Sequence, residues 1–215
     1  MDNIESKVMP KVFLWMFIGL LITFLTGYVV SNNEKMLLTV FSTGSYFIFA
    51  IVEIVLVLVL SVKIKKLKPT TCKVMFMLYS FISGLTFSSI FVYYKLSSIM
   101  FIFLIAAAVF GIFSLIGYTT KIDLTKIGTF FIMALVGAIL CSVVNIFIKS
   151  ANLDLALSVL ILVIFMGITA YDIQKIKKNL RDIPEENLAI YGALELYLDY
   201  INIFIQLLKL FGKER

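Results

Sequence analysis

Four acidic side chains lie inside strongly apolar stretches of this chain, where carboxylates are rare. They are Glu53, Asp172, Glu195 and Asp199. A carboxylate in the hydrocarbon of a bilayer costs at least about 2.5–3.5 kcal/mol, so such residues usually face a bundle interior and mark ion or proton pathways. The chemistry that these residues predict is binding of cations or protons within a membrane.

The last apolar stretch carries its polar residues at a regular spacing. Glu195, Asp199, Asn202 and Gln206 follow one another at intervals of 4, 3 and 4 residues, which places them on one face of a helix. A polar stripe on an otherwise apolar helix cannot face lipid, so we expect this helix to be central. The stripe predicts either a wet path or a hydrogen-bonded seam between helices. Repulsion between two carboxylates one turn apart favours the path.

Glu53 and Asp172 each allow two interpretations. Glu53 lies well inside its apolar stretch and is either a ligand on an ion path or a bundle-facing residue that pairs with a hydroxyl or backbone group. Asp172 lies at the edge of its stretch, so it is either functional or a boundary residue that pairs with Lys175.

The composition excludes most enzymatic chemistry. The chain has no histidine, so histidine-based catalysis, zinc sites and pH sensing are absent, and any pH response near neutrality must come from carboxyl groups. Cys72 and Cys141 are isolated in the sequence and predict neither a disulfide framework nor a metal cluster. An aspartyl protease would share a proton between two aspartates, but the Gly-x-Gly of intramembrane members does not precede Asp199. We therefore expect no enzyme and no bound cofactor.

Hydrophobic residues make up 61% of the 215 positions, charged residues only 15%, and the mean hydropathy is +1.06. A soluble domain has roughly 45–50% apolar and about 25% charged residues, so the excess must face lipid. The sequence predicts an all-α polytopic membrane protein, a single domain over residues 1–215. Seven runs are long enough to span a bilayer: 12–30, 37–62, 74–94, 97–118, 127–148, 155–171 and 188–208.

The distribution of cations predicts the orientation in the cell membrane. Of the 19 lysines and arginines, 13 fall on the side of the N-terminus, including Arg181, and six on the other side. The N-terminus is therefore expected in the cytoplasm and the C-terminus outside. We assign the net charge of +6 to this orientation and expect the bilayer, not nucleic acid, as the partner.

Several segments resemble a known family. They are FISGLT at 81–86, GYTTKIDL at 117–124 followed by Gly128, VNIF at 144–147, YDIQKI at 171–176 and ALELYLDYINIF at 193–204. Together they resemble the Bax inhibitor-1 family, also called the transmembrane Bax inhibitor motif family. The resemblance implies seven helices, with two three-helix layers around a central C-terminal helix. It also implies a passive, pH-sensitive calcium leak, with calcium as the permeant ion and protons as the regulator.

The resemblance also implies roles for single residues. Asp172 and Asp199 match the aspartate pair that senses pH by sharing a proton. Because Asp199 is 11 residues past Leu188, the two meet only if the sixth helix is deeper than its apolar run suggests or the last helix starts early, in the cytoplasm. Glu185, Glu186 and Asn187 after Pro184 suit such an early start. In place of an arginine that bacterial members carry near the sixth-helix aspartate, this chain offers Lys63 and Lys65.

Three functions remain open at the level of sequence. In a calcium leak, Glu53, Glu195, Asp199 and Asn202 would line the ion path and supply transient oxygen ligands, the first three of them carboxylates. The alternatives are a proton-coupled cation transporter that uses the same acids and a non-conducting membrane scaffold. The sequence identifies no protein partner.

Overall fold

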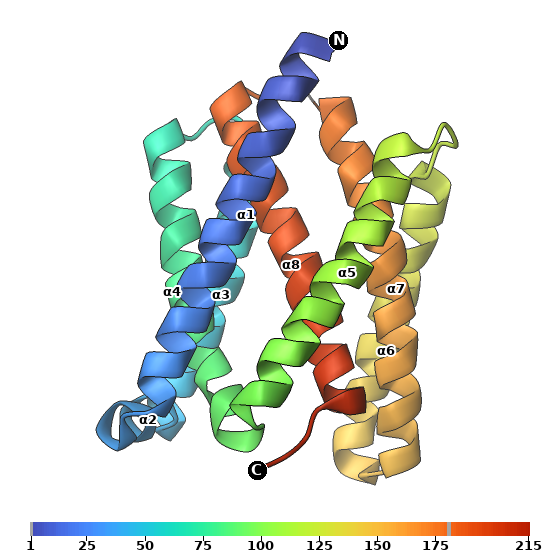
Figure 1. Ribbon diagram of the computed structural model, residues 1–215. Coiled ribbons are helices and arrows are strands. Elements are labelled where there is room, and N and C mark those ends of the chain that lie inside the picture. Colours follow the sequence, from blue (N-terminus) through green and yellow to red (C-terminus); the bar gives the residue numbers. More distant parts are fainter. Residues whose placement is uncertain (1, 180–181) are drawn as a thin grey trace. The chain divides into compact units, whose positions relative to one another are not determined.

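The computed structural model describes residues 2–179 and 182–215, and within them the side chains of residues 2–4, 43 and 46 are not described. Arg181, one of the cations used above, therefore lies outside the described residues. The described elements are eight helices: α1 (Asp2–Ser31), α2 (Glu34–Val40), α3 (Thr43–Lys63), α4 (Pro69–Tyr93), α5 (Leu96–Thr119), α6 (Thr125–Ile148), α7 (Ala151–Lys178) and α8 (Glu185–Phe211) (Figure 1). The all-α prediction is confirmed.

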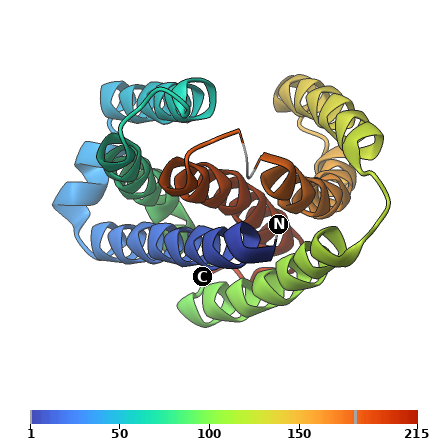
Figure 2. The ribbon, with the colours of Figure 1, turned by 90° about the horizontal axis from the view of Figure 1, so that it is seen from above.

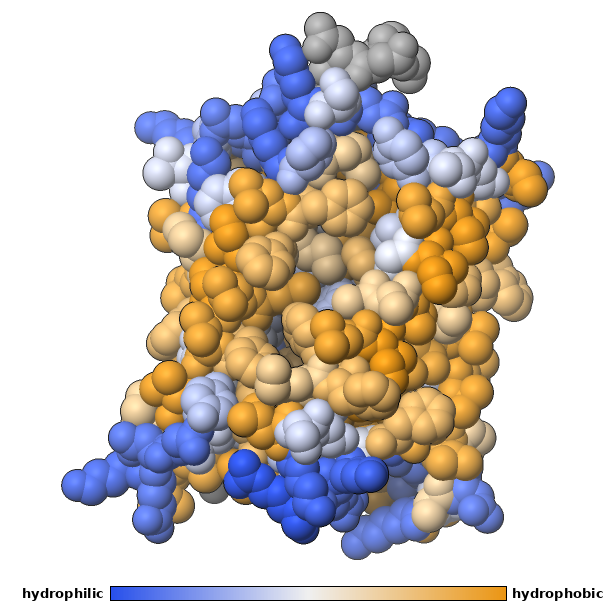
Figure 3. Space-filling model, viewed as in Figure 1, coloured by the Kyte–Doolittle hydropathy of each residue, from blue (hydrophilic) through white to orange (hydrophobic). Residues whose placement is uncertain are grey.

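Six helices are long and apolar enough to cross a membrane in the described part of the chain. They are α1 from Glu5, α4, α5, α6, α7 and α8. The burial of these spans differs widely: 72% of the most apolar window of α8 is buried, against 11% for α6. The apolar middle parts of the helices are visible in Figure 3, with hydrophilic residues at helix ends. We expect the exposed apolar side chains of α6 to face the lipid of the membrane.

The second predicted run, 37–62, is wrong as a single helix. The structure divides it into α2, which ends at Val40, and α3, which begins at Thr43. At the break, the hydroxyl of Ser42 donates to the carbonyl oxygen of Thr39 at 3.0 Å and lies 2.9 Å from the hydroxyl of Ser45. Local bonds of this kind give the backbone an alternative to continuing the helix, and hydropathy alone does not detect them.

Contacts within the chain divide it into two compact units. Unit 1 comprises 1–95, 178–197 and 214–215, and unit 2 comprises 96–177 and 198–213, apart from the residues not described. Each unit contains three long helices, α1, α3 and α4 in unit 1 and α5, α6 and α7 in unit 2. Helix α8 contributes its residues up to Tyr197 to unit 1 and the rest to unit 2. The single domain over 1–215 stays a prediction.

In unit 1, α4 contacts both α1 and α3, as Figures 1 and 2 show. A Cβ atom added at Gly84 of α4 would lie 2.6 Å from Cβ of Thr26 and 2.8 Å from the carbonyl oxygen of Thr23, both on α1. Ser80 and Ser88, one turn away on either side, are fully buried. The spacing of four residues between Ser80, Gly84 and Ser88 is the small-residue pattern that lets two helices approach closely.

In unit 2, α7 packs against both α5 and α6. A Cβ atom at Gly117 of α5 would overlap the backbone of Ala170 on α7, so only glycine permits this approach. The ring of Tyr171 lies directly against Gly128 of α6. Both contacts adjoin Asp172, so close packing on two sides holds this stretch of α7 in place.

Candidate ion-binding site

Asp172 and Asp199, the predicted pH-sensing pair, both lie in unit 2. Asp172 is on α7 and is 5% exposed, and Asp199 is on α8 and is 2% exposed. Two carboxyl groups are thus buried in membrane-spanning helices of the same unit. Their sharing of a proton stays a prediction.

Asp172 lies deeper in its helix than the apolar run suggested. The run ends at residue 171, but α7 continues to Lys178, so Asp172 has nearly two further turns of helix after it. The ammonium of Lys175 lies 3.5 Å from Oδ1 of Asp172, one turn further along the same helix. This ion pair agrees with the interpretation of Asp172 as a boundary residue. The burial of the Asp172 side chain agrees with the interpretation of Asp172 as a functional residue.

The loop between α5 and α6 is bound to α7 just beyond Asp172. The backbone N–H of Leu124 donates to Oε1 of Gln174 at 2.9 Å, and Nε2 of Gln174 donates to the carbonyl oxygen of Ile122 at 2.8 Å. The ammonium of Lys177 donates to the carbonyl oxygen of Tyr118 at 3.0 Å and lies 4.1 Å from the centre of its ring. Segments 117–124 and 171–176, both identified by sequence, are therefore physically connected. The sequence gave no role to Gln174 or Lys177.

Helix α8 begins at Glu185, as the residues after Pro184 suggested. Ion pairs join this first turn to two other helices of unit 1: Lys11 to Glu185 at 2.6 Å and Lys73 to Glu186 at 2.7 Å. The side-chain amide of Asn187 donates to the carbonyl oxygens of Ile64 and Leu67, at 2.6 and 2.9 Å. The start of α8 is thus fixed to α1, to α4 and to the α3–α4 connection.

The polar stripe of α8 is divided between the two units. Glu195 is partly buried in unit 1, whereas Asp199, Asn202 and Gln206 belong to unit 2. The amide of Asn202 donates to the carbonyl oxygen of Leu198 in its own helix at 2.8 Å. Gln206 is 7% exposed, and its Oε1 has no hydrogen-bond partner among the described residues. The side-chain carbonyl oxygen of Gln206 is therefore buried and available to accept a hydrogen bond.

Glu53 accepts a hydrogen bond in unit 1. The hydroxyl of Thr86 on α4 donates to Oε1 of Glu53 on α3 at 3.0 Å, and the carboxyl group is partly buried. This is the hydroxyl pairing that one of the two interpretations of Glu53 proposed. A hydrogen bond from a neutral hydroxyl does not itself neutralise a carboxylate, so the pairing is compatible with an ion path too.

A buried cluster of hydroxyl groups in unit 1 was missed by sequence reasoning. The hydroxyls of Thr23 and Tyr197 lie 2.7 Å apart, and Thr23 donates to the carbonyl oxygen of Ser80 at 2.9 Å. The ring of Tyr79 on α4 packs edge to face against that of Tyr197, with ring centres 5.5 Å apart. These contacts connect α1, α4 and α8. The recurrence of serine along α4 is the signal in the sequence that could have revealed them.

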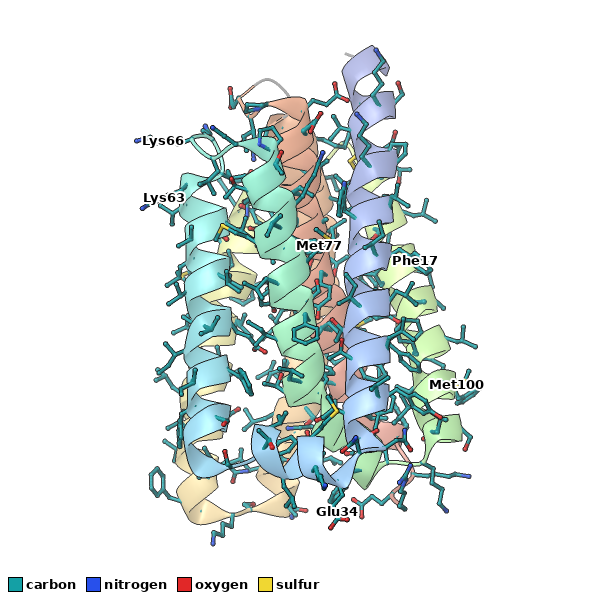
Figure 4. All side chains as sticks on the ribbon, turned by 90° about the vertical axis from the view of Figure 1, so that its left-hand side faces the viewer. Phe17, Glu34, Lys63, Lys66, Met77 and Met100 are labelled. Carbon is teal, nitrogen blue, oxygen red and sulfur yellow. The ribbon has the colours of Figure 1, made fainter. Side chains whose placement is uncertain are left out.

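The predicted carboxylate ligands do not form a closed metal site. Among the described residues, no group of three or more acidic or thiol side chains is close enough to hold a metal ion. Lys63 and Lys65, the predicted substitutes for an arginine, are exposed in unit 1. Figure 4 shows Lys63 and Lys66 at one end of the helices of unit 1, projecting outward, and Glu34 at the opposite end.

Buried carboxyl groups on apolar helices define a polytopic α-helical membrane protein with ionisable groups in its interior. The family described as "Inhibitor of apoptosis-promoting Bax1" matches residues 5–215. The inner membrane protein YbhL of Escherichia coli K12 is 41% identical, covering 96% of this chain and 92% of the relative. A protein of Borreliella burgdorferi is also 41% identical, covering 99% of this chain and 94% of the relative. The protein RP147 of Rickettsia prowazekii is 35% identical, covering 100% of this chain and 92% of the relative. The chain belongs to the Bax inhibitor-1 family and is a multi-pass protein of the cell membrane.

Proposed function

We propose that the protein is a passive, pH-sensitive calcium leak in which Asp172 and Asp199 share a proton. The observation that carries the proposal is the burial of both carboxyl groups in spanning helices of one unit. Two buried carboxylates repel, so holding one proton between them stabilises the pair. Gain or loss of that proton changes the force between α7 and α8. With no histidine in the chain, carboxyl groups are the groups available for this response.

Oxygen ligands of the kind that calcium prefers are present in both units. Glu53 and Glu195 in unit 1 and Asp199 in unit 2 are the proposed carboxylate ligands. The side-chain carbonyl oxygen of Asn202, three residues after Asp199, is the fourth proposed ligand. Because no three acids gather among the residues described, each ligand would hold the ion weakly. Weak binding of the ion at one ligand after another favours its movement along a path, whereas tight binding would hold it at one site.

The experiment measures calcium entry into proteoliposomes that contain a calcium-sensitive dye, between pH 5 and pH 8. We expect the protein to raise entry above that of empty vesicles, to an extent that varies with pH. Asp199→Asn should remove most of that variation. The matched control is Asp154→Asn, because Asp154 is an exposed acid at the start of α7, 3.8 Å from Lys209.

Entry equal to that of empty vesicles at every pH would refute the leak. Stoichiometric proton counterflow would instead identify a proton-coupled transporter. Unchanged pH dependence in Asp199→Asn would refute the aspartate pair while leaving the leak intact.

With this function we propose seven membrane crossings, which adds α3 to the six spans above, and six helices in two layers around α8. The N-terminus would be cytoplasmic, with Lys63 or Lys65 as a charge partner of Asp172. Labelling with a membrane-impermeant maleimide tests the orientation in a Cys72→Ser, Cys141→Ser background. Ser6→Cys should react only from the cytoplasmic side, and reaction from outside would reverse the topology.

A further inference from the structure

An apolar groove with a polar end lies in unit 2, where α5 begins and the chain leaves α8. Its volume is about 480 Å³, within the range of roughly 300–1,000 Å³ of ligand sites. Three polar residues line it, Ser97, Ser98 and Lys213. Four apolar residues complete the lining, among them Phe101, Ile105 and Phe211. Figure 3 shows hydrophilic surface at the bottom of the view, where Figure 1 places the C-terminus, with apolar surface above it.

We propose that this groove binds an anionic phospholipid, with the phosphate at Lys213 and an acyl chain along the apolar lining. Positions 98, 101 and 105 follow the spacing of one helix face, so the lining residues of α5 form a continuous stripe. From Ser98 to Ile105 the stripe runs about 10 Å along α5 into its apolar span. The groove thus has the polarity of a lipid that enters from the membrane surface.

The position of Lys213 is fixed by the fold. Its backbone N–H donates to the hydroxyl of Ser98 at 3.0 Å, which ties the segment after α8 to the first turn of α5. The side chain of Lys213 is exposed. The described residues that line the groove include no acid to oppose it. A lysine held at the membrane surface attracts anionic head groups, and the two serine hydroxyls are further hydrogen-bond donors for a phosphate.

A second groove, in unit 1, provides an internal comparison. It measures about 370 Å³ and is lined by Leu37, Leu38, Phe41, Ser89, Val92 and Tyr93. No cation is among these described lining residues. It should therefore accept acyl chains without preferring a charged head group.

The test uses tryptophan fluorescence and brominated lipids, which quench a tryptophan that they touch. Trp15 is the single tryptophan, so Trp15→Phe removes the background. In this background Phe101→Trp reports on the charged groove and Leu38→Trp on the uncharged one. The replaced side chains are 64% and 66% exposed, so the two reporters are matched. Quenching by brominated phosphatidylglycerol and phosphatidylcholine, in the full-length protein in vesicles, gives the relative affinity at each site.

We expect phosphatidylglycerol to be preferred about fivefold at Phe101→Trp, which corresponds to about 1 kcal/mol for one lysine. Adding Lys213→Gln should reduce the preference to about one. Lys149→Gln, which removes a lysine at the end of α6 that does not line the groove, should leave the preference unchanged. Leu38→Trp should show no preference.

Equal quenching by the two lipids at Phe101→Trp would overturn the proposal, and so would a preference that persists in Lys213→Gln. Loss of the preference on addition of inorganic phosphate would identify a free anion instead of a lipid. Circular dichroism and gel filtration of each variant check the fold. The Lys149→Gln control shows whether the loss of a lysine outside the groove changes the lipid preference. Calcium flux does not enter this test, so its outcome is independent of the leak.

Discussion

Asn187→Ala should destabilise the protein although it changes one small side chain near a helix end. Asn187 is 1% exposed, and its amide donates to two backbone carbonyls between α3 and α4, at 2.6 Å to Ile64 and 2.9 Å to Leu67. The first bond is buried and the second partly buried. Loss of a partner for a buried carbonyl costs about 1–3 kcal/mol, and loss of an ordinary hydrogen bond about 0.5–1.5 kcal/mol. The expected loss in the free energy of unfolding is therefore about 2–4 kcal/mol.

The assay is unfolding by titration with sodium dodecyl sulfate in a mild detergent, followed by circular dichroism. Asn32→Ala is the control, because the amide of Asn32 also donates to a backbone carbonyl, that of Tyr28 at 2.7 Å, but in an exposed position. Its effect should stay within about 0.5 kcal/mol. If Asn187→Ala changes stability no more than Asn32→Ala, the amide of Asn187 does not hold the α3–α4 connection and the reasoning from burial is refuted.

Two further predictions concern contacts between helices. Gly117→Ala should lower the free energy of unfolding by about 1–3 kcal/mol, because the added methyl group would overlap the backbone of Ala170. Gly111→Ala on the same helix has no neighbour within 4 Å at its added Cβ and should be neutral or stabilising by up to about 1 kcal/mol, so equal losses would contradict the packing argument. Thr23→Val and Tyr197→Phe, combined in a double-mutant cycle, should give a coupling energy of about 0.6–1.7 kcal/mol, whereas additive effects would show that their 2.7 Å contact contributes nothing.

Hydropathy predicted where helices occur better than where they end. Run 37–62 contains a break because hydrogen bonds of Ser42 compete with the helix, and a windowed average does not register one hydroxyl. Run 155–171 stopped short of Lys178 because α7 continues as a polar helix beyond the apolar part. The early start of α8 was suggested correctly, since acidic residues after a proline are typical of a first helical turn.

The candidate site was predicted only in part. The four acids within apolar segments were found because the cost of burying charge makes them conspicuous in any sequence. The partners of those acids were found less well. Thr86, which donates to Glu53, comes from another helix, and its sequence shows no more than a serine- and threonine-rich segment. Gln174 and Lys177 appeared as ordinary polar residues at a helix end, yet they hold the α5–α6 loop.

By itself, the sequence determined that this is an all-α membrane protein with segments typical of the Bax inhibitor-1 family and that its last helix is buried. The fold class and the burial follow from composition and helical period, and the family follows from the resemblance of short segments. All of these are local properties of the chain. Tertiary structure alone decided three contacts. Asn187 donates a hydrogen bond to the α3–α4 connection, Gly117 meets the backbone of Ala170, and Lys213 lies beside an apolar groove. Each of these depends on residues roughly 50 to 120 positions apart meeting in space, and no local pattern encodes that distance.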